Sequence, residues 1–157
     1  STFKLNNQWA ILRDRHCFIL NHEIQKQIDF PIQSAGQFGS DGFSISLNKI
    51  DTPSMDLNSF HEVIDGSILE GKTLSIRSWR NGDVFQPLGM AGHKKVSDFL
   101  VDEKVDRFSK GKQLVLTANE EIIWVCGRRL SDKAKITHST QELLELSMQT
   151  KVGLSWT

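Results

Sequence analysis

Basic side chains gather around one short stretch in the middle of the chain. Lys94 and Lys95 follow a loop that contains Gly89 and Gly92, and we expect a helix to begin beside them. The first backbone N–H groups of a helix have no partner within it, and they bind anions such as phosphate. The pattern therefore predicts a phosphate cradle. The alternative is that both lysines simply point into water.

Five arginines lie on the neighbouring elements and could extend this basic surface. The planar guanidinium group donates two hydrogen bonds to one anion, which suits contact with RNA phosphates. For Arg77 and Arg107 the alternative is an internal salt bridge. Their candidate partners are Asp83, Asp98 and Asp102. The five candidates for RNA contact are Arg77, Arg80, Arg107, Arg128 and Arg129.

Three large aromatic side chains accompany these cations. Trp79, Phe85 and Trp124 could stack on bases, as aromatic side chains do in proteins that bind single-stranded nucleic acid. We favour packing in the core for all three, because aromatic side chains contribute much of the buried apolar area of a domain.

Enzyme and metal chemistry have little support in the sequence. There is no His-Glu-x-x-His, Gly-x-Ser-x-Gly or Cys-x-x-Cys motif. The five histidines lack the spacing of metal ligands, so we expect no metal site and no catalytic residue in this chain. Cys17 and Cys126 are far apart in sequence, and we expect both to be buried, reduced thiols in a cytosolic protein.

The composition fits a globular protein of one domain, or of one domain with a docked subdomain. Of its 157 residues, 38% are hydrophobic and 24% are charged. No apolar run approaches the roughly 20 residues of a membrane span, so we expect a cytoplasmic protein without membrane contact. The start, Ser1 to Lys4, lacks an initiator Met and resembles no signal peptide. We therefore expect a fragment of a longer protein.

The net charge of zero conceals an uneven distribution. Residues 1–71 hold 5 Lys or Arg against 9 Asp or Glu, whereas residues 72–135 hold 13 against 8. The middle of the chain could therefore present a basic face to a nucleic acid. A chance imbalance on a solvated surface is the alternative.

Short strands dominate the predicted secondary structure. Helical spacing or a capping pattern predicts helices only over residues 94–104, 106–111 and 143–148. Glycine and serine content predicts a loop over residues 34–42. Two hairpins are expected, one near the start and one beginning at residue 113. The expected strands are residues 9–12, 16–20, 43–47, 60–64, 73–80, 113–117, 122–126 and 151–156.

Residues 74–137 resemble the C-terminal domain of tRNA(Ile)-lysidine synthetase. Three motifs carry the resemblance in the order of that family, and Lys135-Ile136-Thr137 resembles the end of its signature. The motifs are Pro87-Leu88-Gly89-Met90, Lys94-Lys95-x-x-Asp98-Phe99 and Trp124-Val125-x-Gly127. The resemblance implies that Lys94 and Lys95 contact the RNA backbone and that the five arginines do so to a lesser extent.

The resemblance also implies an activity for the parent protein. The family's enzyme is a ligase that attaches lysine to the wobble cytidine of tRNA-Ile with a CAU anticodon. ATP, with Mg, first adenylates the base, and lysine then displaces AMP. That chemistry belongs to an N-terminal domain with a Ser-Gly-Gly-x-Asp-Ser loop, which is absent from these residues. We therefore expect this fragment to hold no cofactor, to be catalytically inactive alone, and to grip the tRNA body, chiefly its acceptor stem.

Four residues depart from the family pattern. Trp79 stands where Arg is usual, and Val84 replaces a common Arg. Asp106 replaces the usual Pro, and Ser109 lies in a stretch that is normally more basic. These departures predict a surface that is less basic than in other members.

Taken together, we expect an α+β fold in which two small sheets form an irregular sandwich with two or three short helices on one side. The related module of phenylalanyl-tRNA synthetase supports this by analogy.

Residues 1–70 would form a strand-rich lead-in subdomain, and residues 71–157 the C-terminal domain. The expected partners are tRNA-Ile and the enzyme's own N-terminal catalytic domain. One alternative is a structural or dimerisation module with little RNA contact, which leaves a homodimer open. The other is an independent small-molecule enzyme.

Overall fold

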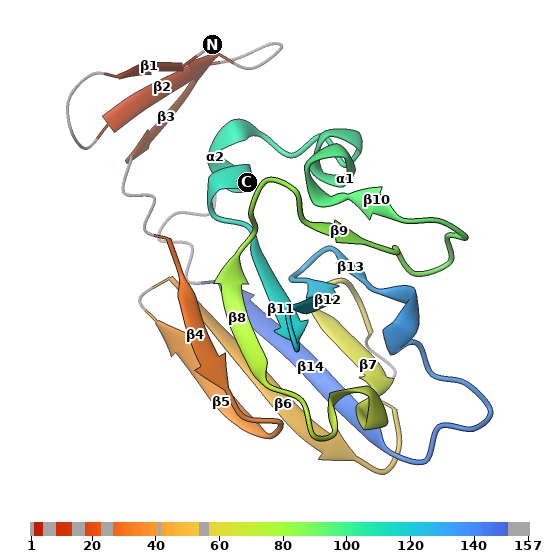
Figure 1. Ribbon diagram of the computed structural model, residues 1–157. Helices are drawn as coiled ribbons and strands as arrows, with labels where there is room; N and C mark the ends of the chain where they lie inside the picture. Colours follow the sequence, from red (N-terminus) through yellow and green to blue (C-terminus); the bar gives the residue numbers. More distant parts are fainter. Residues whose placement is uncertain are drawn as a thin grey trace.

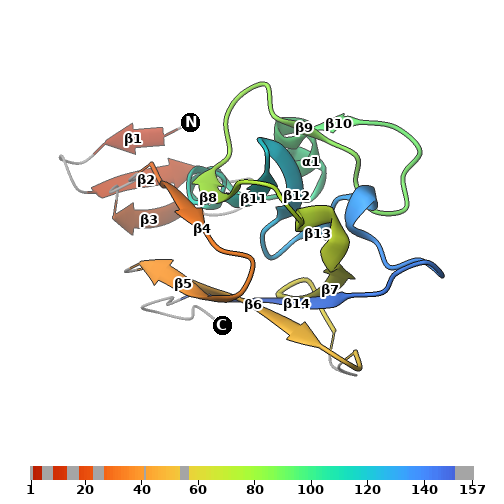
Figure 2. The same ribbon diagram turned by 60° about the horizontal axis from the view of Figure 1, so that its bottom comes forward.

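Two antiparallel sheets lie face to face, and short helices cover the outer side of one of them (Figures 1 and 2). The computed structural model describes residues 2–4, 9–13, 18–22, 27–40, 42–53 and 57–150. Both sheets and all the helices of this part fall within residues 29–150. The architecture is the strand-rich α+β sandwich that the sequence predicts.

The first sheet has five strands in the order β13-β12-β11-β8-β4, so it joins distant parts of the chain. Its neighbouring strands are all antiparallel. The predicted hairpin is confirmed as β11 and β12, whose connection uses left-handed backbone at Asn119 (φ 47°) and Glu120 (φ 69°). The strands are β4 (Asp29–Ile32), β8 (Leu74–Ser78), β11 (Leu114–Ala118), β12 (Glu121–Val125) and β13 (Arg129–Leu130).

The second sheet has four strands in the order β5-β6-β14-β7. The late strand β14 lies between two early strands and pairs with β6 along its whole length. The strands are β5 (Gly36–Ser40), β6 (Phe43–Ile50), β7 (His61–Asp65) and β14 (Leu143–Thr150). Separately, β1 (Thr2–Lys4), β2 (Trp9–Arg13) and β3 (Phe18–His22) form a small sheet. The pairing of β2 with β3 confirms the hairpin predicted near the start.

The main core fills the space between the two sheets. In β6, Phe43, Ile45 and Leu47 are buried, whereas the residues between them are partly exposed. This alternation is the signature of a strand with one face on the core. From the opposite sheet, Leu116 and Trp124 pack into the same cluster and are completely buried.

A second core lies between the five-stranded sheet and the helical layer. That layer holds α1 (Val96–Asp102), α2 (Arg107–Gly111) and the two-residue strands β9 (Val84–Phe85) and β10 (Lys94–Lys95). Phe85 and Phe99 meet edge to face at 5.3 Å, and Val115 of β11 packs against them from the sheet. Because β11 faces a core on each side, all five of its residues are buried. The short 3₁₀ turns η1 (Gly66–Leu69) and η2 (Asp132–Ala134) lie in connections.

The helix predicted over residues 143–148 is wrong, because this segment is part of β14. Leu144 and Leu146 are buried, whereas Leu143 and Glu145 are partly exposed, which is a period of two. The segment lies between β6 and β7 and forms antiparallel pairs with both strands. Tertiary pairing therefore outweighs a short helical pattern.

The loop predicted over residues 34–42 is also wrong, because most of it is β5. The structure explains why this strand contains glycine at two positions. A Cβ on Gly39 would lie 2.5 Å from the carbonyl oxygen of Phe43, and Gly36 has a φ of +131°. The strand β4 was not predicted, because Pro31 lies within it and proline is confined to edge strands such as this one.

The two expected helices of the middle region are present but shorter. The first begins at Val96 rather than at residue 94, and the second begins at Arg107 rather than at residue 106. The strands predicted around residues 43–47, 60–64 and 73–80 are confirmed. The strand predicted over residues 151–156 lies outside the described residues.

Each large sheet draws strands from both sides of residue 70. β4 pairs with β8 in one sheet, and β14 pairs with β6 and β7 in the other. The lead-in segment and the C-terminal segment expected from the sequence therefore share both sheets and the core between them.

Candidate nucleic-acid interface

The two lysines of the predicted phosphate cradle lie on β10 and point to opposite sides. Lys94 pairs with Phe85 and Lys95 with Val84 in the β9–β10 ladder. Neighbouring side chains on a strand face opposite ways. Lys94 is accordingly half-buried and forms an ion pair with Asp102, whereas Lys95 is exposed.

The backbone N–H groups at the start of α1, which were expected to bind phosphate, are partly satisfied by groups of the protein itself. Its first N–H, from Val96, donates to the carbonyl oxygen of Asp83 at 2.9 Å. Asp98 places a carboxylate in the first turn, and the preceding Lys95 makes no side-chain capping bond. An acidic group at a helix start complements the helix dipole as an anion would. The structure therefore presents one accessible lysine here, rather than two lysines beside free N–H groups.

Arg77 is buried and bound to Asp83, which is the internal salt bridge given as its alternative. Its Nη1 and Nη2 each donate to one carboxylate oxygen of Asp83 at 2.9 Å, and Nη1 also donates to the carbonyl oxygen of Ser78 at 3.1 Å. The side chains of Arg77 and Asp83 are 6% and 13% exposed. Arg77 therefore has no guanidinium face to offer to RNA.

The pair shifts the ionisation of both partners toward the charged forms. Burial alone would raise the pKa of Asp83, but hydrogen bonds from Arg77 and from the backbone N–H of Arg80, with the charges of both arginines, lower it below its ordinary value. The hydrogen bond to Asp83 raises the pKa of Arg77. The Arg80 N–H lies 2.7 Å from the Asp83 carboxylate. Asp83 thus ties β8, the following turn and the start of α1 together.

Three other candidate arginines are engaged at the surface. Arg80 forms an exposed ion pair with Asp29 at 2.9 Å. The Nε of Arg128 donates to the side chain of Gln113 at 2.8 Å. Arg129 lies over the ring of Phe99, 5.9 Å from its centroid, and its Nη2 is 3.9 Å from a carboxylate oxygen of Glu103. Such contacts orient an arginine without removing it from solvent.

The last candidate, Arg107, is an exposed residue at the start of α2. The helix is capped by Asp106, whose carboxylate accepts from the N–H of Ser109 at 2.9 Å and from its hydroxyl at 2.7 Å. Asp106 and Ser109 are two of the four departures from the family pattern. The two departures are linked in the structure, because the Asp106 carboxylate that caps α2 accepts hydrogen bonds from Ser109.

The aromatic side chains are structural, as favoured from the sequence. Phe85 and Trp124 are buried in the two cores. Trp79 packs against the second core, and its indole N–H donates to the carbonyl oxygen of Lys110 at 2.6 Å. None of the three is therefore displayed as a platform for a base.

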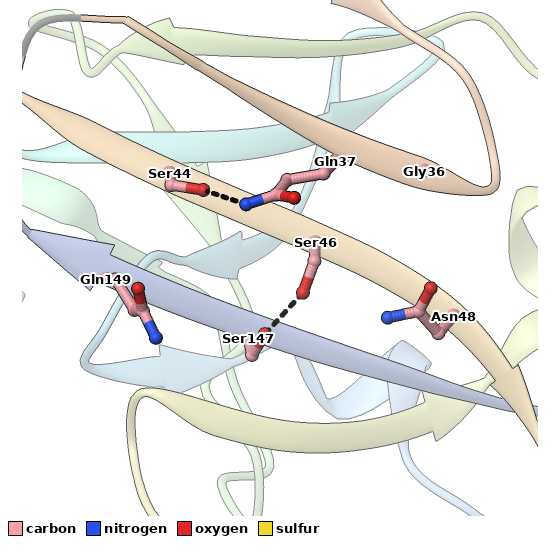
Figure 3. A pocket seen from close by; sticks show the side chains of 7 residues that line it. All are labelled: Gly36, Gln37, Ser44, Ser46, Asn48, Ser147 and Gln149. Atoms are coloured by element: carbon pink, nitrogen blue, oxygen red, sulfur yellow. Dashed lines mark hydrogen bonds between the residues drawn. The ribbon is translucent and has the colours of Figure 1, made fainter.

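A shallow groove on the outer face of the four-stranded sheet has a different character (Figure 3). It encloses about 320 Å³, and its lining carries no charged side chain. Ser46 and Ser147 are hydrogen bonded across β6 and β14, and Gln37 donates to Ser44 at 3.0 Å. We call it the outer-face groove; its residues are Gly36, Gln37, Ser44, Ser46, Asn48, Ser147 and Gln149. With no cation it is poorly suited to hold a phosphate backbone.

The protein-family comparison shows which family the middle of this chain resembles. Residues 74–147 match a family model described as the TilS substrate C-terminal domain. This segment is therefore similar to members of that family. The match starts at the first residue of β8 and ends within β14, so it includes the helical layer and the whole of β11 and β12.

Relatives of the TilS C-terminal region extend the match to most of the chain. A tRNA(Ile)-lysidine synthase of Bacteroides thetaiotaomicron is 27% identical over 143 residues, which is 89% of this chain and 31% of the relative. Those of Parabacteroides distasonis and Caldanaerobacter subterraneus are 39% and 29% identical over 45% and 72% of this chain, and over 16% and 23% of their own lengths. The chain thus spans a third or less of these relatives.

A solved structure shares the fold. It is described as "Crystal structure of TILS C-terminal domain" and matches with a TM-score of 0.69 at 19% identity, over 80% of this chain and 98% of that chain. The α+β sandwich described above is therefore the fold of a TilS C-terminal domain.

The Pro87–Met90 motif, which carries part of the resemblance to the TilS C-terminal domain, forms a hydrogen-bonded turn. The N–H of Met90 donates to the carbonyl oxygen of Pro87 at 2.9 Å, and Gly89 takes a φ of +83° between them. The N–H of Gly89 donates to the carboxylate of Asp132 at 3.1 Å, which lowers the pKa of Asp132. Sequence reasoning missed Asp132, because Gly89 lies far from it in the chain and no spacing rule marks the pair. It named Asp102 as a partner for Arg77 or Arg107, whereas the structure pairs Asp102 with Lys94.

Cys126 is a buried free thiol, as predicted, and burial raises its pKa. Cys17 lies outside the described residues. Within the described ranges, no helix is long and apolar enough to cross a membrane, and no three or more His, Cys, Asp or Glu side chains cluster as metal ligands do.

Proposed function

We propose that this chain is the tRNA-binding C-terminal region of a tRNA(Ile)-lysidine synthase. The observation that carries the proposal is the family match over residues 74–147, together with curated relatives that bear this enzyme's name. The substrate would be tRNA-Ile with a CAU anticodon. Catalysis, with ATP, Mg and lysine, would belong to the enzyme's N-terminal domain, and this region would be inactive by itself.

The proposed contact surface is the helical layer of α1, α2 and β10, which projects from one side of the five-stranded sheet (Figure 1). Lys95 and Arg107 are exposed candidate cations, whereas Lys94 is half-buried and Arg77 is buried. Double-stranded RNA such as an acceptor stem is bound mainly through phosphates and 2′-hydroxyl groups. Two exposed cations in one layer suit that kind of contact.

The test is the salt dependence of tRNA binding. We expect the chain to bind a tRNA-Ile(CAU) transcript with an affinity that falls steeply as salt rises, because phosphate contacts release counterions. Lys95→Ala and Arg107→Ala should each reduce the slope of log affinity against log salt by about one. Filter binding or fluorescence anisotropy at several salt concentrations measures this slope.

Lys133→Ala is the matched control, because Lys133 is also an exposed lysine but lies on η2, outside the helical layer, and pairs with Glu121 of β12. It should leave the slope unchanged. Equal effects of all three substitutions would mean non-specific attraction, and unchanged slopes for Lys95 and Arg107 would remove them from the interface.

A structural role is the second candidate. The observation that favours it is the pairing of Lys94, Arg80 and Arg129 with carboxylates, which reduces the free basic charge of the surface. In that case the isolated chain would not bind tRNA at near-physiological salt. Deleting it from the whole enzyme would then lower the melting temperature of the enzyme, with little change in tRNA affinity.

A further inference from the structure

Gln113 is a buried polar residue whose side-chain amide is hydrogen bonded at both ends. It lies between α2 and β11 and is 6% exposed. Its Nε2 donates to the carbonyl oxygens of Leu114 and Cys126, both at 2.8 Å. Its Oε1 accepts from the Nε of Arg128 at 2.8 Å. Because both amide hydrogens are taken by carbonyls, the amide oxygen has to face Arg128.

This contact holds the Arg128 side chain by its Nε and leaves the end of the guanidinium group available. Arg128 is partly exposed, and within the described residues neither of its Nη atoms has a hydrogen-bond partner. By contrast, Arg77, Arg80 and Arg129 each face a carboxylate. The two Nη groups of an arginine form a planar fork that matches two oxygens of one phosphate.

The backbone that carries Arg128 is also held in place. It forms the turn from β12 to β13, where Gly127 has a φ of +76° and the N–H of Arg128 donates to the carbonyl oxygen of Val125 at 2.9 Å. A Cβ on Gly127 would lie 2.9 Å from the ring of Phe60, so that ring packs closely against the turn. A side chain that is already oriented loses less conformational freedom when it binds a ligand.

Two further cations lie on the segment that leads into Gln113. Lys110 is in the last turn of α2 and Lys112 follows that helix. None of the ion pairs among the described residues involves Arg128 or either lysine. Trp79 joins the segment to the end of β8, because its backbone N–H donates to Gln113 at 3.2 Å and its indole N–H to Lys110 at 2.6 Å. The segment and the Arg128 turn therefore meet at the end of the five-stranded sheet where α2 lies (Figure 1).

We propose that Arg128 binds one backbone phosphate of RNA through both Nη groups, and that Gln113 is the positioning residue that orients it. The inference rests on the proposed function and adds a contact at the end of the sheet to those of Lys95 and Arg107. A phosphate contact carries no base preference, so Arg128 fixes the position of the RNA rather than reading its sequence.

Substitutions of Arg128 test the phosphate contact, with the tRNA-Ile(CAU) transcript and fluorescence anisotropy at several salt concentrations. Arg128→Ala should reduce the slope of log affinity against log salt by about one. Arg128→Lys keeps the charge but loses the fork. It should therefore keep the slope near that of the wild type, while the affinity falls at least about threefold.

A double-mutant cycle tests the positioning role of Gln113. Gln113→Met keeps the size of the side chain and removes its hydrogen bonds, so it should lower the affinity at least about threefold without changing the slope. In the Arg128→Ala background it should have no further effect, because no guanidinium group remains to be oriented. A merely structural Gln113 would lower the affinity equally in both backgrounds, which would overturn its positioning role. Thermal melts show whether Gln113→Met is folded, and Arg128→Lys tests the fork without disturbing Gln113.

Lys72→Ala is the matched control, because Lys72 is exposed and precedes β8, at the opposite end of that strand from Trp79. It should leave slope and affinity unchanged. If Arg128→Ala left the slope unchanged while the chain still bound tRNA, the Arg128 contact would be overturned and the proposed function would stand. If the wild-type chain did not bind tRNA, both would fall. Inorganic phosphate could raise the melting temperature of the wild type but not of Arg128→Ala, with equal tRNA slopes. That outcome would indicate a site for free phosphate and would overturn the RNA contact.

Discussion

Single residues in this protein show how a charged pair can replace an expected binding contact. Arg77 is suited by type and position to touch RNA, yet the structure places it against Asp83 in a buried, two-bond geometry. The sequence allows both roles, because spacing alone does not reveal burial. Asp106 is the opposite case, because aspartate is a preferred helix cap and the structure places its carboxylate in that role, accepting from the N–H of Ser109.

Asp83→Asn should lower the free energy of unfolding by about 2–4 kcal/mol near neutral pH, because it leaves the buried Arg77 without its counter-charge. The pKa of Asp83 is lowered in the folded state, so its stabilising effect is complete above the ordinary value of about 3.9. It disappears as pH falls through the lower folded value. The stability difference between wild type and variant should therefore shrink below about pH 4, as urea unfolding at several pH values can measure.

Asp29→Asn provides the comparison, because Asp29 pairs with Arg80 at an exposed site, where the two side chains are 57% and 56% exposed. It should cost less than about 1 kcal/mol. If the two variants were equally stable, the Arg77–Asp83 pair would have no special structural importance, and Arg77 would again be a candidate for RNA contact.

At the level of elements, a strand could be predicted where apolar and polar residues alternate strictly. Elsewhere the neighbouring strands, which the sequence does not reveal, determine the structure. β6 and β8 could be predicted, because their apolar residues alternate over five positions or more. β5 could not, because glycines weaken its pattern. β14 could not either, because two adjacent leucines and a capping-like start are compatible with a helix until β6 and β7 are known to flank the segment.

Two leucine substitutions in β14 test that correction. Leu144 is 1% exposed and faces the main core, so Leu144→Ala should lower the unfolding free energy by about 2–5 kcal/mol. Leu143 lies on the other side of the strand and is partly exposed, so Leu143→Ala should cost clearly less. Chemical denaturation of the two variants measures the difference. Similar costs would indicate a helix-like face that includes both leucines.

At the level of the whole molecule, the order of strands in space differs from their order in the chain. The motifs of the family lie between β8 and η2, which suggested a boundary near residue 70. Sequence patterns report local periodicity, but they do not report that β4 completes one sheet or that β14 completes the other. Such long-range pairings are the part of this fold that a single sequence does not encode in any local signal.

The shared sheets predict how the chain tolerates cutting. A fragment of residues 71–157 keeps β8 and β14 but loses β4, β5, β6 and β7, so the inner faces of both sheets would be exposed to water. We expect it to lack a cooperative thermal transition and to show poorly dispersed NMR signals, with recovery on co-expression with residues 1–70.

A fragment of residues 27–157 is the control. It removes only the separate β1–β3 sheet and should unfold cooperatively, because both large sheets and both cores remain. Cooperative folding of residues 71–157 alone would instead establish the boundary at residue 70 and make the pairing of β14 with β6 and β7 dispensable.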